Sequence, residues 1–142
     1  HNENAFLKRP LGHDYKYFAL DTTDKLVEWT ENAVKTEFDI ESINDLPYGK
    51  GFGLVRERVL NNLTKLKSLV SHLIIVGHRK TAVAIDNSTA VEPETLDLSG
   101  RLKNMIMSKC DAIGYIFREE DELMVSFKAK DAIEAGSRCD HL

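Results

Sequence analysis

Long hydrophobic runs and several familiar enzyme motifs are missing from this sequence of 142 residues. No apolar stretch approaches the roughly 20 residues that a membrane-spanning helix needs, and no signal peptide is visible. The sequence also lacks the dinucleotide-binding fingerprint, the serine nucleophile elbow, and the glycine-rich phosphate loop that ends in Lys-Ser or Lys-Thr. Its two cysteines, Cys110 and Cys139, have no metal-ligand spacing, so we expect reduced thiols in a cytoplasmic protein.

The composition is that of a soluble globular domain. Hydrophobic residues make up 42% of the chain and charged residues 30%, with a formal net charge of −4. This acidic balance removes the general electrostatic argument for nucleic-acid binding, although a local basic patch can still bind it. The length fits one domain over 1–142, with loops expected at 1–14 and 131–142. The polar opening at His1 is typical of the interior of a protein, so a fragment and a complete chain both stay open.

A short apolar run, Tyr17–Leu20, ends abruptly at Asp21 and is followed at once by a helical pattern. The run predicts a buried strand, and ligands of an open α/β sheet bind where strands end and the following loops begin. An Asp in this place can hold a metal ion or orient a water molecule. Asp and Thr are also common helix N-caps, which need no ligand, so capping and a binding site both stay open for Asp21–Asp24.

Four consecutive branched apolar residues predict a second buried strand at Leu73–Val76, with His78 two residues beyond it. Two helical patterns, Leu26–Phe38 and Leu54–Val70, separate the strands. Strand, helix, helix and strand form a crossover connection between parallel strands. We therefore expect Asp21 and His78 at the same carboxyl edge of a parallel sheet, facing one crevice. A loop histidine without a role is the plain alternative for His78.

The connection Asp39–Gly53 has a glycine-rich tip that carries Lys50 and two aromatic residues, Tyr48 and Phe52. It is not a phosphate loop, because no hydroxyl residue follows the lysine and no strand precedes it. Tyr48 and Phe52 can stack on the bases of single-stranded nucleic acid while Lys50 meets a phosphate. A plain turn with aromatic anchors fits the same residues.

The last part of the chain predicts a long loop over Ala82–Leu98, a short helix over Gly100–Lys109 that Ser99 caps, and a β-hairpin. The hairpin strands are expected at Asp111–Arg118 and Leu123–Lys130, on either side of an acidic turn. The turn lacks the spaced ligands of a metal cage. The pattern as a whole is α/β with a C-terminal β-hairpin.

In their order and spacing, these motifs resemble the second half of a RecA-like P-loop ATPase core, especially in phage AAA-type nucleotide-binding proteins linked to recombination and single-strand annealing. Tyr17–Thr22 resembles their Walker B strand, and Leu73–His78 resembles the next strand with its polar sensor residue. Leu96–Ile116 resembles the following helix and strand. Phe127–Lys130 and Arg138 resemble the basic residues after the hairpin. The resemblance covers most of the chain.

The resemblance implies a partial three-layer α/β/α sheet of parallel strands and a site for ATP and Mg²⁺. Asp21 would hold Mg²⁺, through water, with Thr22 close by. His78 would sense the γ-phosphate or the attacking water. A basic residue after the hairpin would act in trans on the nucleotide of a neighbouring subunit, where it stabilises transition-state charge. The candidates are Lys128, Lys130 and Arg138, for each of which a solvated surface cation is the plain alternative.

Two functions in different classes follow. The first is part of an ATP-binding and ATP-hydrolysing phage AAA protein, a ring or filament of identical subunits that acts on DNA in recombination or replication inside the infected bacterium. The second is a non-catalytic, degenerate P-loop module that binds a protein partner or single-stranded DNA through Tyr48–Gly53. Because the phosphate loop and the catalytic Glu are absent from these residues, we expect this chain alone to bind ATP poorly and to be inactive.

Overall fold

The computed structural model describes residues 15–80, 95–98, 100–129 and 134–140. The expectations for Ser99, Lys130, residues 1–14 and most of the long loop therefore lie outside the described residues. The chain divides into two compact units, His1–Gly77 and His78–Leu142. Their described residues form three α-helices and several short strands. The class is mixed α/β, as the sequence indicates, whereas the three-layer RecA-like arrangement stays a prediction.

The first unit contains a pair of parallel strands, β1 (Tyr17–Leu20) and β2 (His72–Ile75), whose register runs from Tyr17 opposite His72 to Leu20 opposite Ile75. Two further hydrogen bonds frame the pair. The N–H of His72 donates to the carbonyl of Lys16, and the N–H of Val76 donates to the carbonyl of Leu20, both at 2.9 Å. The predicted crossover between parallel strands is therefore confirmed.

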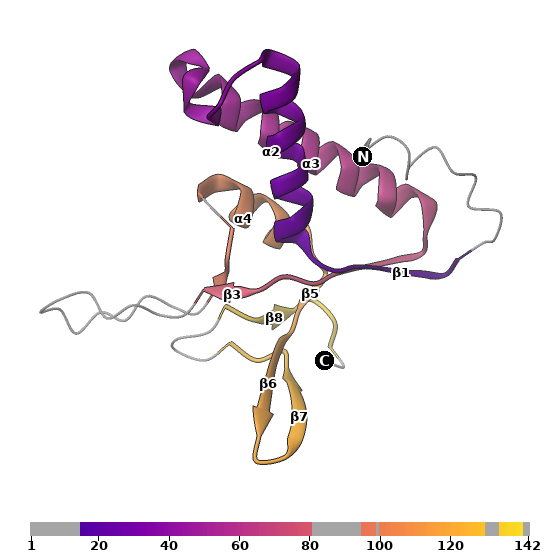
Figure 1. Ribbon diagram of the computed structural model, residues 1–142. Helices are drawn as coiled ribbons and strands as arrows, with labels where there is room; N and C mark the ends of the chain where they lie inside the picture. Colours follow the sequence, from indigo (N-terminus) through magenta and orange to yellow (C-terminus); the bar gives the residue numbers. More distant parts are fainter. Residues whose placement is uncertain (1–14, 81–94, 99, 130–133, 141–142) are drawn as a thin grey trace, which may run out of the picture. The chain divides into compact units, whose positions relative to one another are not determined.

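Within the first unit, the two helices cover one face of the parallel strands. The strand residues alternate between half-buried and exposed, with Tyr17 57% and Ile74 50% exposed. In Figure 1 both long helices of this unit lie on the same side of β1. The expectation that the strands are buried, which is usual for sequences of this kind, therefore stays a prediction for their other face.

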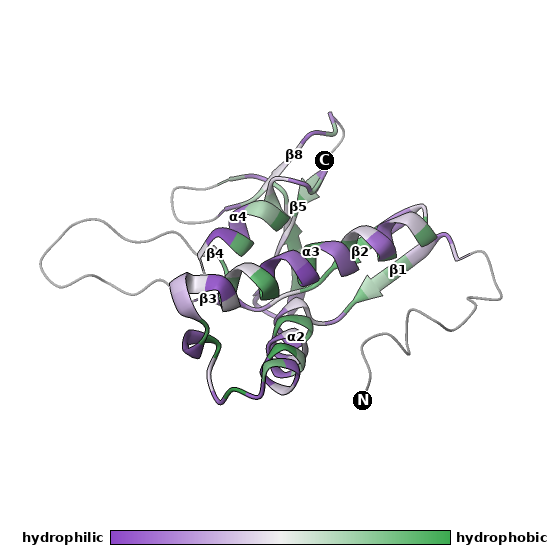
Figure 2. Ribbon diagram, turned by 90° about the horizontal axis from the view of Figure 1, so that it is seen from above, coloured by the Kyte–Doolittle hydropathy of each residue, from purple (hydrophilic) through white to green (hydrophobic). Residues whose placement is uncertain are grey.

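Helices α2 (Thr23–Phe38) and α3 (Lys50–Leu69) pack against each other and form the core of the first unit. Their hydrophobic residues alternate with hydrophilic ones along each helix (Figure 2), as expected for helices with one face in a core. An ion pair of 2.7 Å joins Arg58 on α3 to Glu37 on α2. The buried hydrophobic residues of the unit are Leu26, Val34, Ile43, Val55, Val59, Leu63 and Leu66.

Helix α3 begins at Lys50, four residues before the predicted start, so the expectation of a loop through Gly53 is wrong there. The connection before it folds into two short 3-10 turns, η1 (Ile43–Asp45) and η2 (Pro47–Gly49). Gly51 is buried against η1, and a methyl group on it would collide with the Ile43 carbonyl oxygen and lie 2.8 Å from Ile43 Cγ2. Close packing thus overrides the low helix propensity of glycine.

The second unit contains two short antiparallel pairs beside helix α4 (Gly100–Met107). Strand β3 (Arg79–Lys80) pairs with β4 (Thr95–Leu96), and β5 (Ala112–Ile113) pairs with β8 (Gly136–Ser137). The sequence analysis predicted loops over the residues of β4 and β8, and that prediction is wrong at these two strands. Glu134 accepts hydrogen bonds from Thr95 Oγ1 and from Lys103 Nζ, the latter at 3.1 Å. The bond from Thr95 lowers the pKa of the Glu134 carboxyl, and Lys103 adds to this effect.

The predicted hairpin is confirmed, with shorter strands than expected. Strand β6 (Tyr115–Glu119) pairs antiparallel with β7 (Glu122–Ser126) across a two-residue turn. The expected strand from Asp111 is interrupted at Gly114, where a Cβ atom would lie 2.9 Å from the ring of Phe127. The second strand ends at Ser126 because the chain bends at Lys128, whose N–H donates to Ser126 Oγ at 3.3 Å.

The packing of Gly51 predicts opposite effects for two glycine-to-alanine substitutions in the first turn of α3. Gly51→Ala forces a methyl group against Ile43 and should lower the free energy of unfolding by about 1–3 kcal/mol. Gly53→Ala has open space around the added Cβ and should raise it by about 0.5–1 kcal/mol through helix propensity. Urea unfolding of both variants measures the two effects. Equal changes in the two variants would contradict the packing described for Gly51.

Candidate functional site

Asp21 and Thr22 lie where β1 ends and α2 begins, at the carboxyl edge of the parallel pair. Thr22 is the N-cap residue of α2, with extended backbone angles, but its side chain makes no capping hydrogen bond. The peptide bond between Asp21 and Thr22 is cis. Because its side chain makes no capping hydrogen bond, the Thr22 hydroxyl does not cap α2. Capping was one of the alternatives that the sequence left open.

Thr23 fixes this junction onto the end of the neighbouring strand. Its N–H and its Oγ1 both donate to the carbonyl of Val76, at 2.8 and 2.9 Å. Thr23 is fully buried, and buried hydrogen bonds of this kind hold their partners in one geometry. The sequence pattern suggested only a capping role for Thr23, since nothing in it shows that the hydroxyl reaches the second strand.

The Thr22 hydroxyl is buried and has no hydrogen-bonding partner among the described residues. A buried hydroxyl without a partner costs free energy, and such groups in native proteins usually have a functional reason. Asp21 directly precedes Thr22 and is exposed, and the described part of the chain gives its carboxylate no hydrogen bond or ion pair. The two side chains thus offer unused oxygen ligands at one end of the sheet.

These oxygens suit a magnesium ion that is shared with phosphates better than a metal held by protein alone. Among the described residues, no group of three or more His, Cys, Asp or Glu side chains could hold a metal ion. Mg²⁺ typically keeps several waters and binds one or two carboxylates together with substrate phosphates. One exposed carboxylate beside an unpaired hydroxyl fits that mode.

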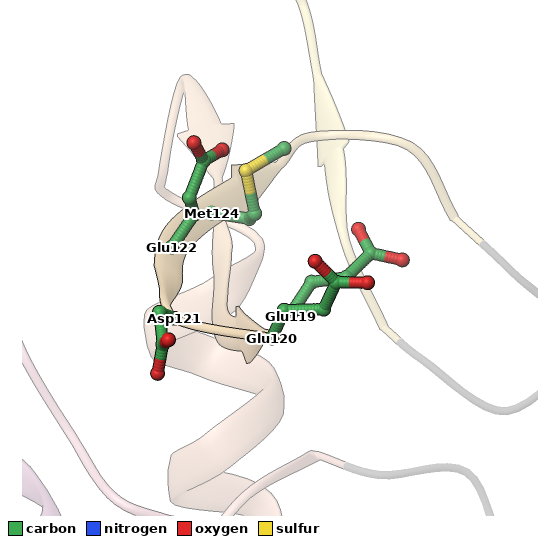
Figure 3. A pocket seen from close by; sticks show the side chains of 5 residues that line it. All are labelled: Glu119, Glu120, Asp121, Glu122 and Met124. Atoms are coloured by element: carbon green, nitrogen blue, oxygen red, sulfur yellow. The ribbon is translucent and has the colours of Figure 1, made fainter.

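The acidic turn of the hairpin is the other concentration of carboxylates. Its side chains line an open hollow together with Met124, and Figure 3 shows four carboxylates that spread around the turn without converging on one point. The acidic residues are Glu119, Glu120, Asp121 and Glu122.

The remaining predicted site residues belong to the second unit. His78 is its first residue, and its backbone carbonyl accepts a hydrogen bond of 2.8 Å from the N–H of Asp97. The expectation that His78 and Asp21 face one crevice stays a prediction. Arg138 is exposed, and its guanidinium donates to the carbonyl of Ser108 at 2.9 Å, just beyond the end of α4. Lys128 is exposed, and Lys130 lies outside the described residues.

The three residues proposed to contact nucleic acid lie around the start of α3. Tyr48 is fully exposed and has a left-handed backbone with φ 57°. Phe52 is 45% exposed, and Lys50 between them is also exposed. The aromatic side chains therefore do not act as buried anchors of a turn, which was the plain alternative.

None of the helices in the described residues is both long enough and apolar enough to cross a membrane. This statement concerns the described ranges only.

The unpaired Thr22 hydroxyl predicts that two adjacent threonines respond to valine with opposite signs. Thr22→Val replaces an unsatisfied buried hydroxyl with a methyl group and should raise the free energy of unfolding by about 1 kcal/mol. Thr23→Val removes the hydrogen bond to Val76 and should lower it by a similar amount, about 1 kcal/mol. Denaturant unfolding measures both. A loss of stability in Thr22→Val as large as that in Thr23→Val would show that the Thr22 hydroxyl has a structural partner.

Comparison with known proteins links this chain to a protein family. A family model described as an AAA domain matches residues 4–139, which is nearly the whole chain. No curated protein and no solved structure matches significantly. The family is one of nucleotide-binding, ATPase-like domains, and its members usually bind the nucleotide with Mg²⁺. Because this match covers nearly the whole sequence, the chain belongs to the AAA domain family.

Proposed function

We propose that this chain is part of a RecA-like AAA ATPase of phage type, and that its nucleotide site lies at the carboxyl edge of β1 and β2. The observation that carries the proposal is the junction after β1, where the exposed Asp21 is followed directly by Thr22, whose buried hydroxyl has no partner among the described residues. Parallel α/β sheets bind ligands at this edge. The family match supports nucleotide as the class of ligand.

In this proposal Asp21 holds Mg²⁺ through a water molecule, and the Thr22 hydroxyl donates to a phosphate oxygen or to that water. The ion neutralises charge on the phosphates when it is bound. Thr23 keeps both residues in place through its two bonds to Val76. His78 senses the γ-phosphate or the attacking water from the chain segment that follows β2.

A basic residue after the hairpin acts on the nucleotide of a neighbouring subunit, in a homo-oligomeric ring or filament within the infected bacterium. Lys128 and Lys130 are better candidates than Arg138, because the guanidinium of Arg138 already donates to the Ser108 carbonyl. A trans-acting cation stabilises charge that develops on the phosphates during transfer. DNA recombination or replication is the process that we propose for the parent protein.

Calorimetric titration of ATP with Mg²⁺ tests the nucleotide site. These residues contain no Walker A motif, so we expect weak binding that needs millimolar ATP and protein at high concentration. Asp21→Asn, which keeps the shape and removes the charge, should abolish the Mg²⁺ dependence of binding. Glu41→Gln changes another exposed acid of the same unit and should leave binding unchanged. The proposal is wrong if the chain does not bind, or if the two variants behave alike.

A second function, binding of single-stranded DNA by a non-catalytic module, is favoured by the exposed aromatic pair Tyr48 and Phe52. Exposed aromatic rings next to a lysine form the kind of surface on which successive bases stack. The contact is compatible with the first function as well, since an ATPase that acts on DNA needs such a surface.

Fluorescence anisotropy with a labelled oligodeoxythymidine tests the aromatic contact. Tyr48→Ala should weaken binding by about 1–3 kcal/mol, the usual value of stacking on one base, and Phe52→Ala should act in the same direction. Trp29→Ala removes another exposed aromatic ring, on α2, and serves as the matched control. DNA binding without any nucleotide binding would favour the non-catalytic function. Equal losses in Tyr48→Ala and Trp29→Ala would argue against a specific surface at Tyr48.

A further inference from the structure

In the described residues, the hairpin of the second unit has an unpaired strand edge and an exposed apolar face. Among the described residues, β7 pairs with β6 and with no other strand. One face of the hairpin carries Ile116 opposite Val125, with Leu123 next to them, and these side chains are 62%, 55% and 69% exposed. Glu122, next to the turn, is the one charged residue of β7. An open strand edge with so little charge is a template for pairing with another chain.

The register of the hairpin shows which backbone groups of β7 are available. Glu119 and Glu122 flank the two-residue turn and are opposite each other. The pair that flanks such a turn is hydrogen-bonded, and hydrogen-bonded pairs alternate with others along the ladder. The backbone groups of Glu122, Met124 and Ser126 therefore face β6, whereas those of Leu123 and Val125 point outward.

The sequence of this edge is complementary to itself. Reading from Glu122 to Lys128, the segment begins with an acid and ends with a base, and between them lie four apolar residues and Ser126. When a second copy is placed antiparallel and centred on Val125, Glu122 of each copy faces Lys128 of the other. The outer edge of β6 is not complementary to itself in this way. If two β6 strands are placed antiparallel about their middle residue, Tyr115 faces Glu119 and no opposite charges meet.

We propose that β7 pairs with β7 of a second copy of this chain, antiparallel and about a two-fold axis at Val125. Val125 then exchanges both backbone hydrogen bonds with Val125 of the second copy, and Leu123 does so with Phe127. Glu122 and Lys128 occupy non-hydrogen-bonded positions, where facing side chains come closest. Opposite charges in facing positions stabilise a sheet. A contact of this kind is isologous, so it joins two copies and is a different contact from the one between neighbouring subunits of the proposed ring or filament.

The pairing requires one conformational change in the hairpin. Strand β7 ends at Ser126, and the bend at Lys128 is held by the hydrogen bond from its N–H to Ser126 Oγ. Phe127 and Lys128 must become extended, so the strand grows by two residues on pairing. The inference does not depend on Asp21, Thr22 or His78. Of the residues that it uses, Lys128 is also a candidate for the trans-acting cation of the proposed function.

Disulfide trapping tests the symmetry axis directly. In a chain with Cys110→Ser and Cys139→Ser, Val125→Cys brings two thiols face to face in the proposed dimer. Oxidised glutathione then oxidises them to an intermolecular disulfide and is itself reduced to two glutathione molecules. Leu123→Cys is the matched control, because the two copies of residue 123 lie four residues apart along the strand, about 13 Å. We expect efficient cross-linking of Val125→Cys and little of Leu123→Cys.

Charge reversal tests the same register without a cross-link. Sedimentation velocity of the unmodified chain should show a dimer that weakens as salt screens the exposed ion pairs. Glu122→Lys and Lys128→Glu should each weaken the dimer several-fold, and the double variant should restore it. A chain that stays monomeric at low salt and high concentration overturns the proposal. So does equal cross-linking of the two cysteine variants, or a double variant no better than the singles.

Discussion

The Val76 carbonyl, which accepts hydrogen bonds from both the N–H and the hydroxyl of Thr23, is the contact on which the candidate site depends. It joins the start of α2 to the end of β2, and its Thr23 side is fully buried, which strengthens the bonds. Asp21 and Thr22 precede Thr23 directly. They are therefore held at the carboxyl edge of the sheet by a neighbour that needs no ligand to stay in place.

This division of roles explains why two adjacent threonines differ so much. The Thr23 hydroxyl is satisfied by backbone, whereas the Thr22 hydroxyl is buried without a partner in the described residues. A fold that tolerates an unsatisfied group next to an exposed carboxylate gives up some stability there. The family match indicates a nucleotide as the class of ligand, and we propose that it satisfies both groups together with Mg²⁺.

Sequence patterns predicted the elements whose residues repeat over several turns or strand positions. The bounds of β1 and the parallel crossover to β2 followed from apolar runs and their separation. The early start of α3 could not be predicted, because Gly51 and Gly53 disfavour a helix and only the packing of Gly51 on Ile43 reveals it. Two-residue strands such as β8 carry no periodicity at all. The resemblance pointed to Asp21 and Thr22, but the unpaired state of the hydroxyl is visible only in three dimensions.

Paramagnetic broadening by Mn²⁺, a substitute for Mg²⁺, is the most direct test of the claim that the metal and nucleotide meet at the end of β1. Amide spectra would be recorded at fixed Mn²⁺ with and without ATP. The account predicts that the ATP-dependent broadening is centred on Asp21 and Thr22, since the phosphates complete the ion's ligands there. ATP-dependent broadening centred on the acidic turn, Glu119–Glu122, with Asp21 unaffected, would contradict it.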